Sequence, residues 1–142
     1  MTTPSSPLHG LLETPVLTDD DMHARIVTIV GPAMFPQLWL LFFTPLGYQL
    51  PLVVPLADPE EGLPESEQCE VMLSALAGAA REMADHPCGV LVIERPDQTT
   101  IRTRDQKWAR RLHFASNTVG LPLRGAYISL ASGVRPLPLT PG

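Results

Sequence analysis

Gly89-Val-Leu-Val-Ile93 is a continuous, largely β-branched apolar run. Such a run is typical of a strand that is covered on both faces of a sheet. A polar turn from Glu94 to Arg102 follows it, and we predict that a helix begins near Thr103. Ligands of open α/β sheets tend to bind beyond the carboxyl ends of strands. We therefore expect a central strand here, and any chemistry between Glu94 and Asp105.

The helix after this turn is predicted from its start signals and its periodicity. Thr103 and Gln106 fit a T-x-x-Q capping box, and Asp105 falls in the first turn, where the helix dipole favours a negative charge. Gly120 is placed to end the helix. Apolar residues recur at helical spacing and predict its buried face: Trp108, Leu112, Ala115 and Val119.

The other elements follow from similar signals. Thr18 can cap a first helix that begins with three aspartates, although residues 26–30 are β-branched enough to form a strand instead. Residues 37–43 and 49–56 flank a Pro/Gly turn and predict a hairpin. Pro51 and Pro55 cannot donate ladder hydrogen bonds, which places the second strand at an edge or gives it a bulge. A helix over residues 66–84 and a last strand over residues 124–130 complete the predicted domain.

This order of elements predicts an α/β (or α+β) fold, in which two main helices cover a mixed β-sheet that contains a β-hairpin. We predict one domain over residues 18–137, a disordered or extended arm over residues 1–17, and an extended, proline-rich tail over residues 138–142.

Composition limits the classes of function. The chain has 142 residues and a net charge of −5, which argues against a general nucleic-acid-binding protein. No apolar run approaches the ~20 residues of a membrane helix, so we expect a cytoplasmic protein without a membrane contact. Two cysteines do not make a disulfide framework, and Cys69 reads as a small buried hydrophobe. No glycine-rich phosphate loop or catalytic-triad spacing is present, so we expect no cofactor.

Basic residues gather in one part of this acidic chain. Most of the ten Lys and Arg residues lie between Arg95 and Arg124. They can form a solvated helix face with weak ion pairs, or a patch that binds an acidic partner segment, a phosphate-bearing ligand or nucleic acid. The candidate binding residues are Arg95, Arg102, Arg104, Lys107, Arg110 and Arg111.

The element order, the polar loop after the third strand and the acidic residue at the next helix start together resemble the RadC-like branch of the JAB/MPN metalloprotease-like family. The resemblance spans roughly residues 38–137 and implies a three-layer JAB/MPN (cytidine deaminase-like) arrangement. In that family the third strand ends in H-x-H-P-S-G and an S-x-x-D follows at the helix entrance. The two histidines and the aspartate hold zinc, and a glutamate from the hairpin is the general base.

The present sequence keeps only part of this pattern. Ile93 and Arg95 stand at the positions of the two histidines, while Pro96 matches the motif's proline. Asp105 matches the aspartate, with Arg102 in place of the serine, and residues 49–56 contain no glutamate. One ligand of three and no base cannot make that zinc hydrolase. We therefore expect no metal, with Asp105 as the remnant ligand position.

His86-Pro-Cys-Gly89 looks like the H-P-S-G motif, but it precedes the strand and has no second histidine. We interpret it as a helix stop and a turn. His86 remains a weak candidate metal ligand, because Cys88 lies only two residues away.

Three functions are compatible with these observations. The first is a non-catalytic, degenerate JAB/MPN-like module that binds a protein partner through the arginine-rich loop and helix. The second is a hydrolase with a non-standard site that includes the candidate catalytic carboxylates Glu94, Asp97 and Asp105, and His86. The third, weaker, is nucleic-acid binding through the arginines. A homodimer through the second strand is a further interpretation that the sequence leaves open.

Overall fold

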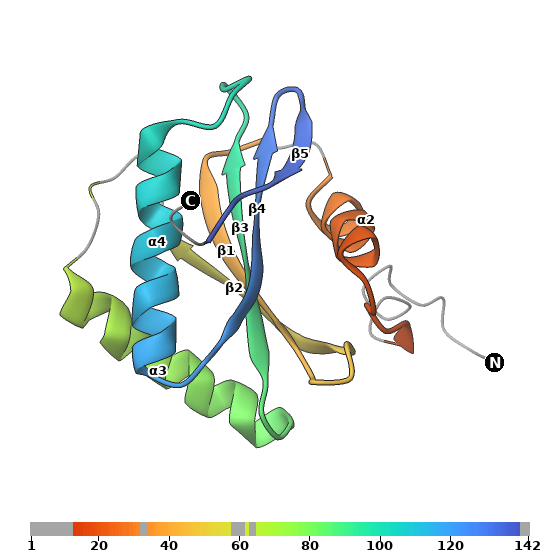
Figure 1. Cartoon of the computed structure of the whole chain (residues 1–142), viewed down its shortest axis with the longest axis vertical. Coiled ribbons are helices and arrows are strands. Elements are labelled where there is room, and N and C mark those ends of the chain that lie inside the picture. Colours follow the sequence, from red (N-terminus) through yellow and green to blue (C-terminus); the bar gives the residue numbers. More distant parts are fainter. Residues whose placement is uncertain (1–12, 32–33, 58–61, 63–64, 140–142) are drawn as a thin grey trace.

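A five-stranded mixed sheet with the strand order β2-β1-β3-β4-β5 forms the centre of the molecule (Figure 1). The computed structural model describes residues 13–31, 34–57, 62 and 65–139. Its elements are, in chain order, α2 (Asp19–Val30), β1 (Gln37–Phe43), β2 (Gln49–Ala57), α3 (Ser66–Met83), β3 (Cys88–Arg95), α4 (Thr103–Thr118), β4 (Leu123–Leu130) and β5 (Gly133–Pro136).

Strand β3, which contains the apolar run of residues 89–93, lies at the centre of the sheet, as predicted. It pairs antiparallel with β1 on one side and parallel with β4 on the other. Strands β1 and β2 form the predicted hairpin. The prediction of a mixed α/β sheet with a β-hairpin is therefore confirmed.

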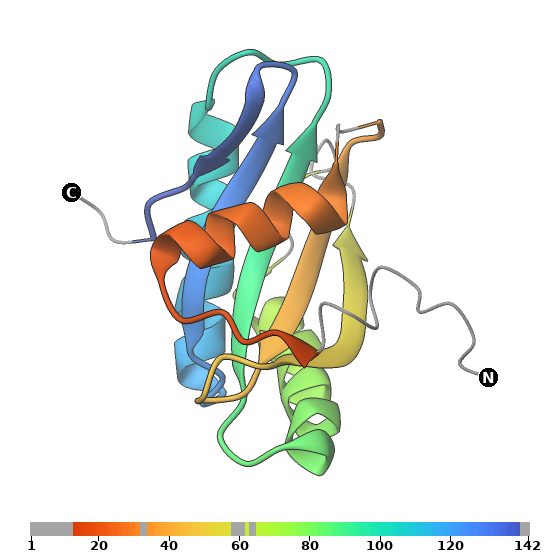
Figure 2. The ribbon, with the colours of Figure 1, turned by 90° about the vertical axis from the view of Figure 1, so that its right-hand side faces the viewer.

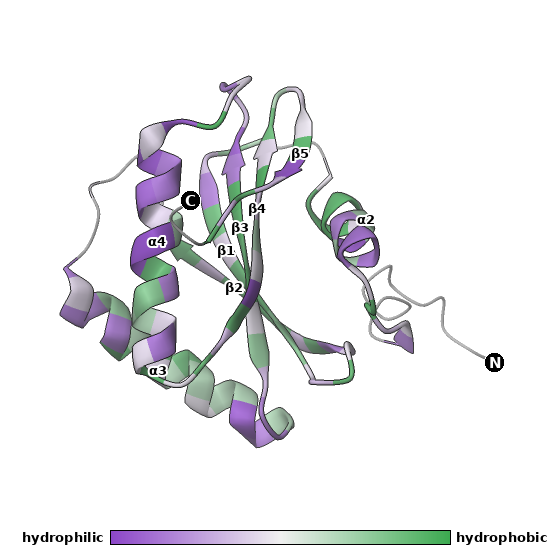
Figure 3. Ribbon diagram, in the orientation of Figure 1, coloured by the Kyte–Doolittle hydropathy of each residue, from purple (hydrophilic) through white to green (hydrophobic). Residues whose placement is uncertain are grey.

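Helices cover both faces of this sheet (Figure 1). Helices α3 and α4 pack side by side on one face, where the larger core cluster contains Trp108, Leu112 and Ile93. Helix α2 lies across the other face (Figure 2), over a smaller cluster that contains Met22, Ile26 and Val92. Hydrophobic and hydrophilic residues alternate along the helices, as expected for helices with one apolar face (Figure 3). Successive residues of β3 therefore point alternately toward α4 and toward α2.

Helix α2 continues to Val30, so the alternative of a strand over residues 26–30 is wrong. One reason is that the first turn of this helix is stabilised by a capping box. Thr18 and Asp21 form a reciprocal capping box, in which the Thr18 hydroxyl accepts from the Asp21 N–H and the Asp21 carboxylate accepts from the Thr18 N–H. Ile26 then falls on the buried face of the helix. Propensity for strand is a weak preference that tertiary packing overrides.

Strand β2 lies at one edge of the sheet, and its pairing with β1 is irregular at two points. Both features agree with the prediction made from Pro51 and Pro55. Cys69 is fully buried in α3, as expected for a small hydrophobe, and both cysteines have free thiols.

Residues near both ends of the described part of the chain pack against the rest of the molecule. A fifth strand, β5, forms a hairpin with β4, and beyond it Leu137 is buried while Leu139 packs against the core. Val16, in the predicted arm, is also buried, and its N–H donates to the carbonyl of Gly47 at 2.7 Å. Val16 and Leu139 thus contribute to the packed structure at its two ends. The rest of the predicted arm, residues 1–12, and residues 140–142 lie outside the described part of the chain.

Candidate functional site

The loop between β3 and α4 is organised around a buried carboxylate, Asp105. Its side chain is 0% exposed and lies in the first turn of α4. Oδ1 accepts a 2.9 Å hydrogen bond from Nε of Arg95, whose side chain is 3% exposed. Oδ2 accepts from Nε2 of Gln98 at 2.9 Å and from the backbone N–H of Arg102 at 3.0 Å. Charge and hydrogen bonding are thus satisfied together, as a buried ion pair requires.

This network explains how α4 begins. The helix starts at Thr103, as predicted, but Asp105 supplies the cap by accepting from the Arg102 N–H. The predicted box of Thr103 and Gln106 is therefore wrong. A carboxylate near the positive end of the helix dipole is favourable in itself. The same carboxylate ties the helix to the end of β3 through Arg95.

Strand β3 extends two residues beyond the apolar run, to Glu94 and Arg95. Because neighbouring residues of a strand point to opposite faces of the sheet, these two candidate residues lie on different faces. Arg95 points toward α4, where it meets Asp105, while Glu94 points toward the α2 face and accepts from Nε1 of Trp39 at 2.8 Å. Asp97 is exposed in the turn that follows. The structure therefore does not bring the three candidate carboxylates, Glu94, Asp97 and Asp105, into one cluster.

Burial raises the pKa of Glu94 above that of an ordinary glutamate, and the hydrogen bond from Trp39 partly opposes this shift. Desolvation disfavours the charged form of the carboxylate, whereas a donor stabilises it. Glu94 therefore lies on the α2 face with a raised pKa, apart from Asp105 on the α4 face.

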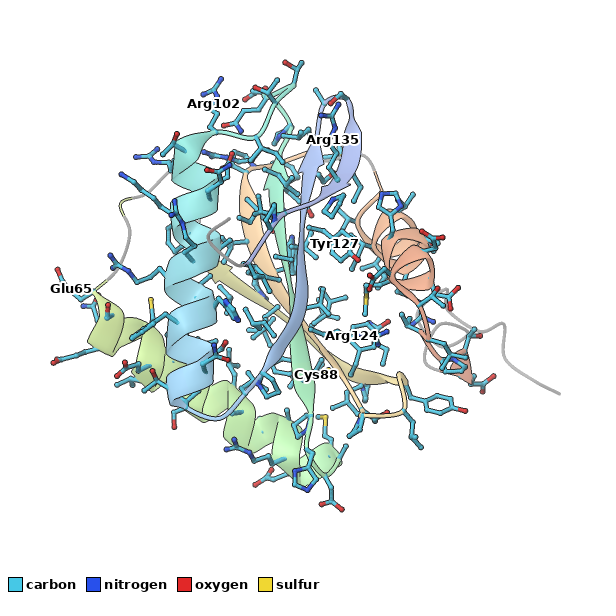
Figure 4. All side chains as sticks on the ribbon, in the orientation of Figure 1. Glu65, Cys88, Arg102, Arg124, Tyr127 and Arg135 are labelled. Atoms are coloured by element: carbon cyan, nitrogen blue, oxygen red, sulfur yellow. The ribbon has the colours of Figure 1, made fainter. Side chains whose placement is uncertain are left out.

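The exposed basic surface is smaller than the sequence indicated. Arg95 is withdrawn into the ion pair, and Arg111 is half-buried and has an interaction of its own. Four basic residues remain exposed at the start of α4, where Arg102 directly precedes the helix: Arg102, Arg104, Lys107 and Arg110. Figure 4 shows Arg102 where the loop enters this helix. We call these four residues the α4 basic surface.

An apolar residue at the end of this surface was not recognised in the sequence. Phe114 is 66% exposed on α4. Lys107, Arg110 and Phe114 follow one another at spacings of three and four, so they share one face of the helix. The spacing of these residues indicates that they share a face. It does not indicate that Phe114 is exposed, because the sequence alone does not distinguish an exposed phenylalanine from a buried one.

His86 lies far from this loop. It precedes β3, so it is at the opposite end of the strand from Arg95, as is Cys88 in Figure 4. Burial raises the pKa of the Cys88 thiol, which disfavours the reactive thiolate. His86 is exposed and has a positive φ of 52°, as expected for a residue in a tight turn. Within the described ranges, no group of three or more His, Cys, Asp or Glu side chains is arranged to hold a metal ion.

The zinc site implied by the family resemblance does not fit these residues. Ile93 stands at one histidine position and is fully buried in the core on the α4 side. Arg95 stands at the other, and its guanidinium directly contacts the Asp105 carboxylate that would be the remaining ligand. Arginine is a cation without a free lone pair and cannot replace histidine as a ligand.

Trp39 is a second residue that the sequence did not single out. It lies on β1 and, together with Glu94, lines a pocket of about 260 Å³ on the α2 face. The hydrogen bond from Trp39 to Glu94 joins the neighbouring strands β1 and β3. It depends on the register of these two strands, which was not predicted from the sequence.

No known family model matches the chain, and no curated protein is significantly similar to it. Of the described helices, none is both long enough and apolar enough to cross a membrane.

Proposed function

We propose that this protein is a non-catalytic interaction module with a degenerate, RadC-like JAB/MPN fold, which binds an acidic segment of a protein partner through the α4 basic surface. One observation supports the proposal that the module is non-catalytic. Arg95 and Asp105, at two of the three ligand positions in the resemblance, form a buried ion pair with each other. The guanidinium supplies the positive charge that a metal would otherwise provide to this aspartate.

The element order supports the fold part of the proposal. A helix, a hairpin, a helix, a strand and a further helix precede β4. Helices α3 and α4 lie together on one face of the sheet and α2 lies on the other (Figure 1). These features agree with the three-layer arrangement that the resemblance implies.

The chemistry of the α4 basic surface supports an anionic partner. Arg104 and Lys107 have no salt bridge to any residue in the described part of the chain, and Arg102 carries its charge at the positive end of the helix dipole. Like charges gathered at this end repel one another, so a bound anion relieves the repulsion. Arginine forks favour carboxylates and phosphates.

A protein partner is favoured over nucleic acid for two reasons. The chain as a whole carries a net charge of −5, which repels a long polyanion. Phe114, on the same face as Lys107 and Arg110, offers an apolar anchor next to the charges. Protein interfaces commonly combine such an aromatic anchor with a charged rim.

The test compares two charge-reversal variants. Arg102→Glu/Arg104→Glu/Arg110→Glu alters the α4 basic surface, while Arg135→Glu alters an exposed arginine on β5 and serves as the control. Affinity capture from a lysate of the source organism should recover a partner with the wild type and the control variant, but not with the triple variant. Phe114→Ala should weaken the same complex.

Two defined ligands separate the alternatives. A glutamate-rich peptide should bind the wild type, while a single-stranded oligonucleotide of equal charge should bind more weakly. Preferential oligonucleotide binding with a steep salt dependence would favour the nucleic-acid function instead. Elemental analysis of freshly purified protein addresses catalysis, since stoichiometric zinc would contradict the loss of the metal site.

A further inference from the structure

The pocket on the α2 face is lined by residues from α2, from the connection to β1 and from three neighbouring strands of the sheet. Val30 comes from the last turn of α2, Phe35 from the connection to β1, Trp39 from β1, Val53 from β2, and Glu94 from β3. Its volume is about 260 Å³. Pockets for drug-sized ligands measure roughly 300 to 1,000 Å³. The pocket is slightly smaller than this range, so its size suits a ligand smaller than a drug molecule.

One charged group lies in this otherwise largely apolar pocket. Glu94 is 6% exposed, and Oε1 accepts from Trp39 Nε1 at 2.8 Å. Within the described residues, Oε2 has no hydrogen-bond partner. Oε2 is not one of the buried polar atoms left without a partner in the described residues, so it is accessible from the pocket, where a ligand with a charged donor can bind it.

The surroundings of Glu94 determine the charge of that ligand. No basic residue lines the pocket in the described ranges. The last turn of α2 contributes Ile29 and Val30 to the wall, and it carries no basic residue, so the negative end of its dipole is not offset. An ammonium bound to Glu94 would also lie near the Trp39 indole, an aromatic ring that attracts cations.

We infer that this pocket binds a small primary alkyl- or arylalkylammonium ion, with the ammonium group on the free oxygen of Glu94 and the apolar part against Phe35, Leu41 and Val53. The pocket lies on the opposite face of the sheet from the α4 basic surface, so this site is independent of the proposed partner binding.

The probes are n-hexylammonium and phenethylammonium, each compared with the alcohol of the same carbon skeleton. Binding is followed by the shift of the Trp39 indole N–H signal in NMR spectra, assigned with Trp39→Phe, since the chain has only two tryptophans. Each amine should bind saturably, and about tenfold more tightly than its alcohol, which corresponds to about 1.4 kcal/mol.

Two variants test the role of charge. Glu94→Gln keeps an oxygen for Trp39 but removes the negative charge, so the preference for amine over alcohol should disappear. Met34→Lys adds a cation at the pocket wall, at a residue that is 75% exposed, so the fold should tolerate it. It should weaken the binding of the amines and leave the alcohols unaffected, while Met34→Leu should change neither.

Equal affinity for amine and alcohol in the wild type would overturn the inference, and so would an unchanged preference in Glu94→Gln. Failure of both amines to shift the Trp39 signal at millimolar concentration would overturn it as well.

Discussion

Arg95, the last residue of β3, and Asp105, in the first turn of α4, form an ion pair with Nε and Oδ1 2.9 Å apart, and both side chains are almost completely buried. The pair fixes the end of the central strand to the start of the helix that covers it. It also determines what each single substitution at these two positions should cost.

Arg95→Met should destabilise the protein by about 3 to 5 kcal/mol, because it leaves the Asp105 carboxylate buried without its cation. Asp105→Leu should cost a similar amount, since it removes the carboxylate that pairs with the buried guanidinium and also the acceptor for Gln98 and the Arg102 N–H. Urea unfolding at neutral pH measures each loss.

The double variant Arg95→Met/Asp105→Leu contains neither charge. Its destabilisation should be smaller than the sum of the two single losses by about 2 kcal/mol or more. Additive losses would show that the pair is not coupled as its geometry indicates.

Glu94 should make stability depend on pH in the opposite sense to a salt-bridged carboxylate. Burial raises its pKa in the folded protein, so between the unfolded and folded pKa values the folded state binds more protons. The contribution of Glu94 to stability therefore falls as pH rises through this window. Glu94→Gln removes the titration, so its stability relative to the wild type should increase from acidic to neutral pH.

Thermal unfolding of wild type and Glu94→Gln over this pH range measures the effect. Asp97→Asn is a suitable control, because Asp97 is exposed. A constant difference in melting temperature between wild type and Glu94→Gln would show that burial does not raise the pKa of Glu94.

Two glycines should respond in opposite directions to replacement by alanine. Gly47 has a φ of +92°, and an added Cβ would lie 2.1 Å from the backbone oxygen of Val16. Gly47→Ala should therefore cost about 2 kcal/mol or more. Gly78 lies inside α3 with no atom within 4 Å of an added Cβ, so Gly78→Ala should stabilise the protein by about 0.5 to 1 kcal/mol.

Denaturant unfolding of both variants checks this prediction. Because the side-chain change is identical, the difference in sign reports only on the backbone and its surroundings. A mild effect of Gly47→Ala would mean that residues 14–17 can move away from the β1–β2 turn without much loss of stability.

The elements that were predicted well from the sequence are those whose apolar residues are buried in the core. The run Val90 to Ile93 is fully buried at the centre of the sheet, and the stripe that begins with Trp108 packs against it. Hydrophobic burial is the main driving force for both, and it is directly visible as a pattern of residues.

The pattern failed where polar residues are buried. The prediction ended the strand at Ile93, because Glu94 and Arg95 are charged. The structure continues it through both residues, since Asp105 compensates Arg95 and Trp39 donates to Glu94. Partners from other elements make such burial possible, and the sequence of the strand itself does not contain them.

Strand β5 was missed for a different reason. It has only four residues, and its one proline, Pro136, and its exposed positions resemble those of a tail. Its identity as a strand depends on hydrogen bonds to β4, and Leu137 is buried only because the hairpin brings it back to the core.

The central place of β3 has a consequence for the order of folding. The hairpins β1–β2 and β4–β5 each join neighbouring segments, whereas β3 pairs with β1 across α3 and with β4 across α4. Closing such long loops is slow, and the parallel pairing of β3 with β4 cannot form without closing the loop that contains α4. We expect both hairpins to form before β3 joins them. Until then the exposed run Val90 to Ile93 is a site at which chains can aggregate, so the segment that organises the native sheet is also a hazard during folding.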